Sequence, residues 1–152
     1  MIQKATELGA YEIVAFPSSR CVSRPDEKSL AKKMERWQKI AASAAEQSGR
    51  GYIPKVLTVD SYKAALNRAA EADKAILLYE NERATTLKMA LEEEKFSTIS
   101  LLTGPEGGLE PKEVEMAKDM DLHICTLGSR ILRCETAPLC ALSAVMYATG
   151  EF

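Results

Sequence analysis

The sequence predicts an α/β fold in which a mostly parallel sheet carries helices on both faces. Short apolar runs alternate with segments of helical periodicity, and the connections between them are short. In addition, glycine-bearing loops follow two of the apolar runs, at residues 103–109 and 127–135. Both loops are expected at the carboxyl ends of strands, where open α/β sheets keep their ligand crevices.

Turn and cap residues set the limits of the predicted elements. Gly9 ends the first helix, Pro17 ends the first strand, Ser61 can cap a helix and Pro111 can begin one. Helices are predicted over residues 1–8, 28–48, 61–70, 87–95, 111–117 and 135–149. Strands are predicted over residues 11–16, 55–59, 74–79, 99–102 and 122–127.

Length and composition predict one ordered domain over residues 1–152. The formal charge of −2 argues against a protein that coats nucleic acid non-specifically. No apolar stretch approaches the roughly 20 residues that cross a bilayer, so we expect a cytoplasmic protein with no membrane contact. The four cysteines form no Cys-x-x-Cys pair and His123 has no ligand partner nearby in sequence, so buried reduced thiols and no metal are expected.

Two helices have faces that predict contacts. The helix at 28–48 carries an apolar stripe at helical spacing and a basic stripe opposite it, which could contact RNA or simply face solvent. The helix at 135–149 is apolar on nearly every side, which favours a homodimer interface, with burial inside a monomer as the alternative. The apolar stripe comprises Leu30, Met34, Trp37, Ala41 and Ala44, and the basic stripe includes Lys28, Lys32 and Arg36.

The glycine loops carry a family resemblance. The string GPEGG at residues 104–108 is followed about twenty residues later by LGSRILRCETA at 127–137, and further matches lie at 2–9, 36–37 and 46–50. This pattern resembles the 16S ribosomal RNA uridine-N3 methyltransferases of the SPOUT superfamily. The resemblance implies S-adenosyl-L-methionine as cofactor, 16S rRNA in the small ribosomal subunit as substrate, a homodimer, and a C-terminal trefoil knot beginning near Gly104. The N-terminal PUA-like barrel of that family has no counterpart in this sequence.

The resemblance also implies which residues hold the cofactor. They belong to the loop that follows the strand at 74–79 and to the two glycine-bearing loops, where a backbone without Cβ atoms lets a flat ligand approach closely. The predicted cofactor-binding residues are Leu78, Tyr79, Thr103, Gly104, Pro105, Gly107, Gly108, Leu127, Gly128, Ser129, Ile131 and Leu132.

Methyl transfer to uridine N3 requires that a proton leave the nitrogen. A cation near the uracil carbonyls would stabilise the developing negative charge, and Arg133 is the first candidate, with Arg20 second. Glu106 and Glu135 are candidate bases, although both could instead accept backbone hydrogen bonds that hold the loops. RNA contacts are predicted at Arg20, Arg24, Lys28, Lys32, Arg36 and Arg50.

One residue departs from the family pattern. Cys134 stands where the resemblance leads us to expect threonine, so a hydroxyl hydrogen bond is lost or replaced by a weak thiol contact. Two other functions remain open at this point. One is a catalytically silent adaptor for RNA or protein with the same fold, and the other is a small nucleotide-binding α/β domain.

Overall fold

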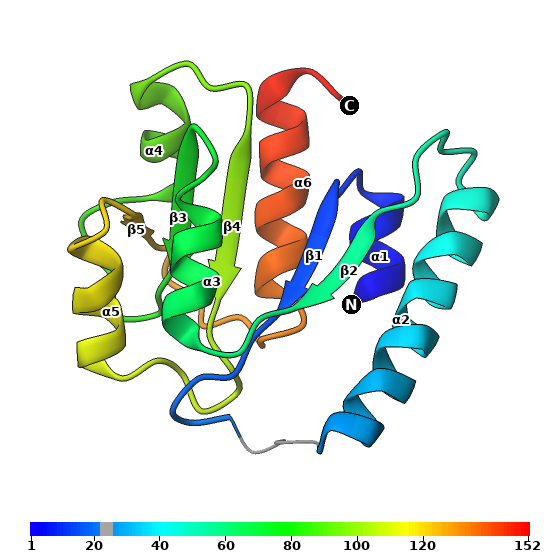
Figure 1. The fold of residues 1–152 in the computed structure, drawn as a ribbon. Coiled ribbons are helices and arrows are strands. Elements are labelled where there is room, and N and C mark those ends of the chain that lie inside the picture. Colours follow the sequence, from blue (N-terminus) through cyan, green and yellow to red (C-terminus); the bar gives the residue numbers. More distant parts are fainter. Residues whose placement is uncertain (22–25) are drawn as a thin grey trace.

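The computed structural model describes residues 1–21 and 26–152 and consists of parallel strands with helices packed around them (Figure 1). The helices are α1 (Ile2–Glu7), α2 (Glu27–Gln47), α3 (Tyr62–Ala69), α4 (Leu87–Glu93), α5 (Pro111–Lys118) and α6 (Ala137–Thr149). The strands are β1 (Glu12–Ala15), β2 (Lys55–Thr58), β3 (Lys74–Leu78), β4 (Ile99–Thr103) and β5 (His123–Cys125).

The strands form two sheets. β1 pairs with β2, and β3 lies between β4 and β5; every pairing within these sheets is parallel, as predicted. At the end of the three-stranded sheet, Leu78 is paired with Thr103 on one side and with Cys125 on the other. Three strands therefore release their following loops side by side at one edge.

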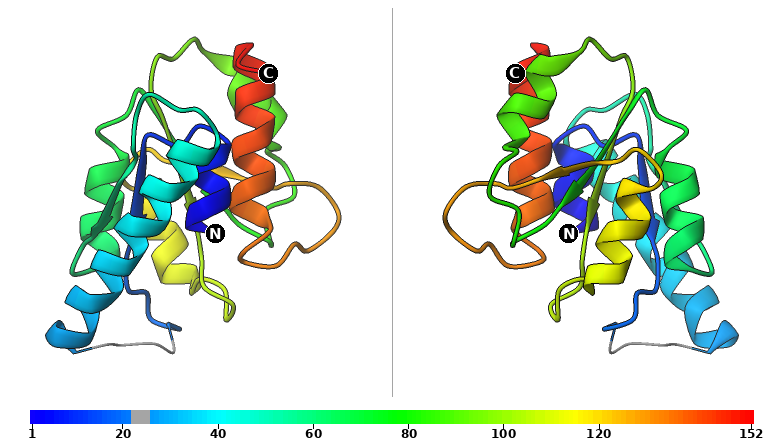
Figure 2. Two further views of the ribbon diagram at one scale, coloured as in Figure 1. Left: turned by 90° about the vertical axis from the view of Figure 1, so that its right-hand side faces the viewer. Right: turned by 90° about the vertical axis from the view of Figure 1, so that its left-hand side faces the viewer.

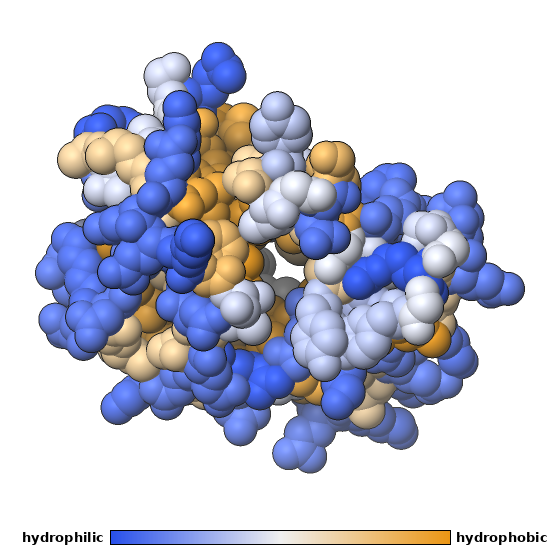
Figure 3. All heavy atoms as spheres, turned by 90° about the horizontal axis from the view of Figure 1, so that it is seen from above, coloured by the Kyte–Doolittle hydropathy of each residue, from blue (hydrophilic) through white to orange (hydrophobic). Residues whose placement is uncertain are grey.

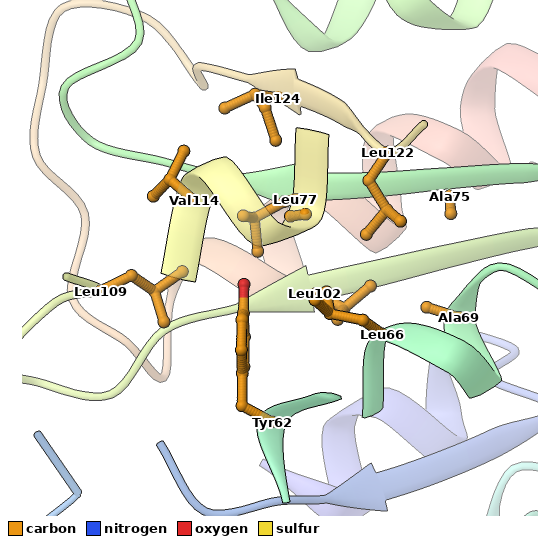
Figure 4. Packing of buried hydrophobic residues seen from close by; sticks show 11 residues of the cluster. Tyr62, Leu66, Ala69, Ala75, Leu77, Leu102, Leu109, Val114, Leu122 and Ile124 are labelled. Carbon is orange, nitrogen blue, oxygen red and sulfur yellow. The ribbon is translucent and has the colours of Figure 1, made fainter. Parts of the chain in front are cut away.

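Alternate residues of β3 divide the core between the two faces of the sheet. Ala75 and Leu77 belong to a cluster that includes side chains from α3 and α5, and Figure 4 shows this packing. Ile76 and Leu78 belong to a second cluster, with side chains from α4 and α6. Because successive strand residues point to opposite faces, β3 is covered on both sides. The two side views in Figure 2 show the helices on either side of the strands, which confirms the predicted arrangement.

Local sequence explains where the helices begin. The Asp26 carboxylate accepts a hydrogen bond from Ser29 N at 2.8 Å, and the Ser61 hydroxyl accepts one from Ala64 N at 3.1 Å. These side chains satisfy backbone N–H groups that have no partner in the first turn of a helix. Pro111 is the first residue of α5, as predicted.

Two packing predictions need correction. The apolar stripe of α2 is fully buried only at Ala41 and Ala44, whereas Leu30, Met34 and Trp37 are half-buried. Figure 1 shows the reason, because the N-terminal half of α2 extends away from the strands. The cysteines were all expected to be buried, but among them only Cys125 is, since Cys21 and Cys134 are half-buried and Cys140 is exposed.

Candidate functional site

A pocket of about 430 Å³ opens at the edge where β3, β4 and β5 end. Its walls come from the loops after these three strands and from the segment that leads into α6. The lining residues are Leu78, Tyr79, Glu80, Thr103, Gly104, Pro105, Glu106, Gly108, Thr126, Leu127, Gly128, Arg130, Ile131, Leu132, Arg133, Cys134, Glu135 and Ala137. The volume is that of a small-molecule site.

The first glycine-bearing loop follows β4, and its glycines lie in close contact with the side chains of Glu80 and Leu109. Gly108 has a φ of +70°, and a Cβ there would lie 2.6 Å from Glu80 Oε1. A Cβ on Gly104 would lie 2.9 Å from Leu109 Cγ. Glycine is needed at Gly108 both for its left-handed backbone and for the absence of a side chain. The Glu80 carboxylate therefore lies directly against the glycine loop.

The loop after β3, which forms one wall of the pocket, is held in place by the carboxylate of Glu82. Glu82 Oε1 accepts hydrogen bonds from the backbone N–H groups of Arg83, Ala84 and Thr85 at 2.8, 2.6 and 3.1 Å. These hydrogen bonds, chiefly those of Ala84 and Thr85, lower the pKa of Glu82 below its usual value. Glu82 was not among the predicted site residues, and no spacing in the sequence indicates that its carboxylate accepts from the three N–H groups that directly follow it.

Thr126 joins this wall to the second glycine-bearing loop. Its N–H donates to Thr85 O at 2.9 Å, and its carbonyl accepts from Leu87 N at 3.1 Å. The Thr126 hydroxyl also lies 3.1 Å from Gly128 O and 3.2 Å from Gly128 N. The loops after β3 and β5 are thus hydrogen-bonded to each other. Thr126 was missed as a pocket residue, although it directly precedes the predicted Leu127.

The predicted cofactor residues come together in this pocket, apart from Gly107 and Ser129, which do not line it. Ile131 lines the pocket and is 78% exposed. A large apolar side chain that remains open at the mouth of a pocket offers a surface for a flat ligand to cover. Thr126, Arg130, Cys134 and Ala137 also line the pocket but were not predicted to bind the cofactor.

Three of the four predicted catalytic residues, Arg133, Glu106 and Glu135, line the pocket. The backbone N–H of Glu135 itself and the Cys134 thiol lower the pKa of the Glu135 carboxyl below its usual value. The Cys134 thiol donates to Glu135 Oε2 at 3.4 Å, and burial together with this carboxylate raises the pKa of the thiol. A weak thiol contact therefore exists where a threonine hydroxyl was expected.

Arg20, the fourth predicted catalytic residue, approaches the glycine loop from outside the pocket. Its Nη1 donates to Gly107 O at 3.0 Å. The guanidinium thus contacts the carbonyl of a loop residue whose neighbours on both sides, Glu106 and Gly108, line the pocket.

The residues predicted to contact RNA lie in different surroundings. Lys28, Lys32 and Arg36 are exposed on α2 at intervals of four residues, so they share one face. Arg50 instead donates to the carbonyls of Thr6, Gly9 and Ala10 at 2.7, 3.3 and 2.9 Å, so the structure gives it a role in holding the end of α1. Arg24 lies outside the described residues.

A second, shallower groove lies beside α6 and is lined by Met1, Glu135, Thr136, Leu139, Cys140 and Ser143. Near it, large apolar side chains are exposed: Met1 is 57% exposed and Tyr147, on α6, is 76% exposed. Figure 3 looks down on the opposite, upper end of the molecule, where hydrophobic and hydrophilic side chains also lie side by side. Ala141 and Val145, on the other side of α6, are buried.

Two kinds of feature are absent from residues 1–21 and 26–152. No helix there is long and apolar enough to cross a bilayer. No group of three or more histidine, cysteine, aspartate and glutamate side chains there could hold a metal ion.

Comparison with known proteins finds clear relatives. Residues 1–146 match a family described as an RNA methyltransferase domain. The ribosomal RNA small subunit methyltransferase E of Bacillus subtilis (strain 168) is 44% identical over 154 residues, which cover 98% of this chain and 60% of that protein. The protein of the same name from Mesomycoplasma hyopneumoniae (strain 232) is 35% identical, covering 93% of this chain and 60% of that protein.

Solved structures agree with these matches. The crystal structure of a ribosomal RNA small subunit methyltransferase E from Neisseria gonorrhoeae bound to S-adenosyl methionine has a TM-score of 0.83 and 39% sequence identity. The alignment covers 95% of this chain and 59% of that one. The chain therefore spans about three fifths of the length of the relatives it matches.

Proposed function

This chain belongs to the RNA methyltransferase domain family, and from that membership and its pocket we propose that it transfers a methyl group from S-adenosyl-L-methionine to N3 of a uridine in 16S ribosomal RNA. The observation that carries the proposal is the pocket at the carboxyl ends of β3, β4 and β5. Both glycine-bearing loops meet there, in a chain 44% identical to a small-subunit rRNA methyltransferase. Residues 1–152 act as one methyltransferase domain of the SPOUT type, in the cytoplasm where ribosomal subunits assemble.

The charges in the pocket favour S-adenosylmethionine over a nucleoside triphosphate or a dinucleotide. Glu80, Glu106 and Glu135 line it together with two arginines, Arg130 and Arg133. A triphosphate would meet three carboxylates, whereas a sulfonium cation is attracted by them. The sequence also lacks a Gly-x-x-x-x-Gly-Lys motif and a Gly-x-Gly-x-x-Gly motif.

The glycine-bearing loops would hold the cofactor through backbone groups. Gly104 and Gly108 provide the close approach, while Leu127, Ile131 and Leu132 offer apolar surface for the adenine ring. When bound, the sulfonium supplies an activated methyl group. The pocket walls must then hold the methyl group in line with the attacking nitrogen, because correct orientation of the reacting atoms lowers the barrier to transfer.

The residues around Arg133 then act on the uracil. The proton on N3 must leave for the nitrogen to attack, and its loss places negative charge on the ring and its carbonyl oxygens. That attack would form the N3–CH₃ bond as the S–CH₃ bond of the cofactor breaks, leaving a neutral thioether. The Arg133 guanidinium stabilises that charge, and a carboxylate accepts the proton. The backbone N–H of Glu135 and the Cys134 thiol lower the pKa of the Glu135 carboxyl, which makes it a weaker base than an ordinary glutamate, and Glu106 is the other candidate in the pocket lining.

RNA reaches the pocket across basic side chains. Lys28, Lys32 and Arg36 on α2 contact phosphates, and Arg20 contacts RNA beside the glycine loop, because guanidinium and ammonium groups suit phosphate oxygens. Exposure of the three α2 residues supports this assignment. The partner of the reaction is thus the small ribosomal subunit or its 16S rRNA.

The chain acts as a homodimer in which α6 meets its counterpart. Support comes from the exposed apolar groups on and near this helix, including Tyr147 and Met1, and from the groove beside it. Exposed apolar surface of this kind is typical of an interface. The groove shares Glu135 with the pocket, so the proposed interface would lie next to the site.

The test is mass spectrometry of nucleosides after methyl transfer. The chain is incubated with S-adenosylmethionine that carries a trideuterated methyl group and with small ribosomal subunits from a strain lacking the modification. The expected product is uridine labelled at N3, and subunits that already carry the modification serve as the control and should remain unlabelled. Label on another base would refute the uridine assignment. Cofactor binding without any label would favour the adaptor function.

A further inference from the structure

Glu113 is a buried carboxylate that hydrogen-bonds two distant parts of the chain. It lies in the first turn of α5 and is 5% exposed. Its Oε2 accepts from Glu110 N at 2.8 Å, and its Oε1 accepts from Ser19 N at 2.9 Å. The first bond is an ordinary helix cap, but the second reaches a loop 94 residues away in sequence. Capping alone does not account for the second bond.

The loop that Glu113 holds is the one that carries Arg20. Ser18 in this loop is buried, and the turn is closed by a hydrogen bond from Cys21 N to Ser18 O at 3.2 Å. Arg20 Nη1 donates to Gly107 O, and a Cβ on Gly107 would lie 3.2 Å from Arg20 Cβ. The loop that carries Arg20 therefore contacts the glycine loop at Gly107. Glu113 holds the Arg20 loop through its hydrogen bond to Ser19, the residue immediately before Arg20.

We infer that Glu113 is a positioning residue, which holds Arg20 against the outer side of the glycine loop so that RNA and cofactor are aligned for methyl transfer. This inference rests on the proposed function. Glu113 is not among the residues that line the pocket, so it acts through Arg20. Burial would raise the pKa of Glu113, but the N–H groups of Ser19 and Glu110 outweigh it and lower the pKa, so the group is ionised at neutral pH.

The variant that isolates this role is Glu113→Gln. The amide keeps the shape of the side chain but has one acceptor oxygen, and its NH₂ group would face one of the two backbone N–H groups. Glu115→Gln is the matched control, because Glu115 is exposed on the same helix and its carboxylate forms an ion pair with Lys118 at 2.8 Å. Both variants remove one negative charge from α5, so a difference between them reports the hydrogen bonds.

Kinetics are the first measurement. We expect Glu113→Gln to lower kcat/KM for RNA by roughly tenfold or more, as for the loss of a hydrogen bond to a charged group. The Kd for S-adenosylmethionine should change by less than about threefold, since the pocket lining is intact. Glu115→Gln should match the wild type in both. A Glu113→Gln enzyme with wild-type RNA kinetics would overturn the inference, as would parallel losses in cofactor affinity and RNA kinetics.

A double-mutant cycle with Arg20→Ala tests whether Glu113 acts through Arg20. If it does, Glu113→Gln should have little further effect on kcat/KM once Arg20 is removed. Effects that multiply would instead show two independent roles and would refute the inference. If Glu113→Gln does not fold, Glu113→Asp takes its place, because it keeps the charge but is one methylene too short to reach both N–H groups.

Amide hydrogen exchange separates failure of this inference from failure of the proposed function. The Ser19 amide should exchange roughly tenfold faster in Glu113→Gln than in the wild type or in Glu115→Gln. This readout needs neither RNA nor methyl transfer. Unchanged exchange at Ser19 would contradict the inference even in an active enzyme, whereas an inactive wild type with the expected exchange would count against the proposed function alone.

Discussion

Arg133 is exposed at the pocket, while its carbonyl accepts hydrogen bonds from Thr136 N and Ala137 N, both at 2.9 Å. The backbone is therefore fixed at the start of α6, with Arg133 in the lining of the pocket. We expect Arg133→Ala to leave S-adenosylmethionine affinity within a few fold and to lower kcat by about 10²–10³, because a charge-stabilising donor is lost. Calorimetry and single-turnover methyl transfer measure the two effects.

Two further variants sharpen that test. Arg133→Lys should restore only part of the rate, because a point charge replaces a planar fork. Arg130→Ala removes the other arginine in the pocket lining and should cost much less in rate if the assignment to Arg133 is right. Parallel loss of cofactor binding and activity in Arg133→Ala would reassign Arg133 to the cofactor, and full activity would remove it from the mechanism.

Gly108 offers a second test at single-residue resolution. Gly108→Ala should weaken S-adenosylmethionine binding, because the new Cβ would displace Glu80, whose Oε1 is 2.6 Å from that position. Gly49→Ala is the control, since Gly49 has the same φ of +70° but no atom within 4 Å of an added Cβ. Both variants place an alanine in the left-handed backbone conformation, which lowers the stability of the fold by about 1–2 kcal/mol.

Calorimetry and thermal unfolding together decide this case. Both variants should unfold at a lower temperature than the wild type, but only Gly108→Ala should lose cofactor affinity. Equal cofactor affinity in the two variants would show that close approach at Gly108 is not required for binding.

At the scale of elements, most of the fold follows from local chemistry. The caps at Asp26 and Ser61 and the start at Pro111 place helix ends within a residue or two of their predicted positions, because each satisfies local N–H groups. The pocket could be predicted because parallel strands release their loops at one edge. By contrast, α6 begins at Ala137, two residues after Glu135, because the chain first turns on the Arg133 carbonyl.

What the sequence could not predict are contacts between distant segments. The bond from Ser19 to Glu113 joins residues 94 apart, and no periodicity or spacing indicates it. Arg50 shows the same limit. Its residue type alone led to the prediction of an RNA contact, but in the structure its guanidinium donates to backbone carbonyls near the end of α1. Residue type gives the chemistry of a group, but its partners depend on tertiary packing.

α6 is the element whose sequence most clearly predicts a partner. We expect Leu142→Glu to convert a dimer into a monomer, because a carboxylate placed in a shared apolar contact is left unpaired. Light scattering across a concentration series measures the mass. Asn67→Glu, on the exposed side of α3, is the control and should leave the mass unchanged. A wild-type chain that is monomeric throughout the series would contradict the proposed interface.

At the scale of the whole molecule, the family resemblance predicts a trefoil knot in the chain from Gly104 onward. Figure 2 shows the segment between β5 and α6 as a wide loop beside the helix. We expect a chain pulled from both ends to remain shorter, after complete unfolding, than the roughly 3.3–3.6 Å per residue that an extended chain reaches. Optical tweezers measure this length. Pulling between residue 1 and residue 98 is the control and should reach full extension. Full extension from end to end would disprove the knot.

The central claim is that the two glycine-bearing loops and the loop after β3 form a site for S-adenosylmethionine. Calorimetric titration of this chain with that cofactor tests the claim most directly, because it needs neither RNA nor any further domain. The expected result is saturable binding of one cofactor per chain, weakened in Gly108→Ala, with no binding of ATP or NAD under the same conditions. Binding of ATP or NAD in place of S-adenosylmethionine would contradict the claim and would favour a nucleotide-binding domain.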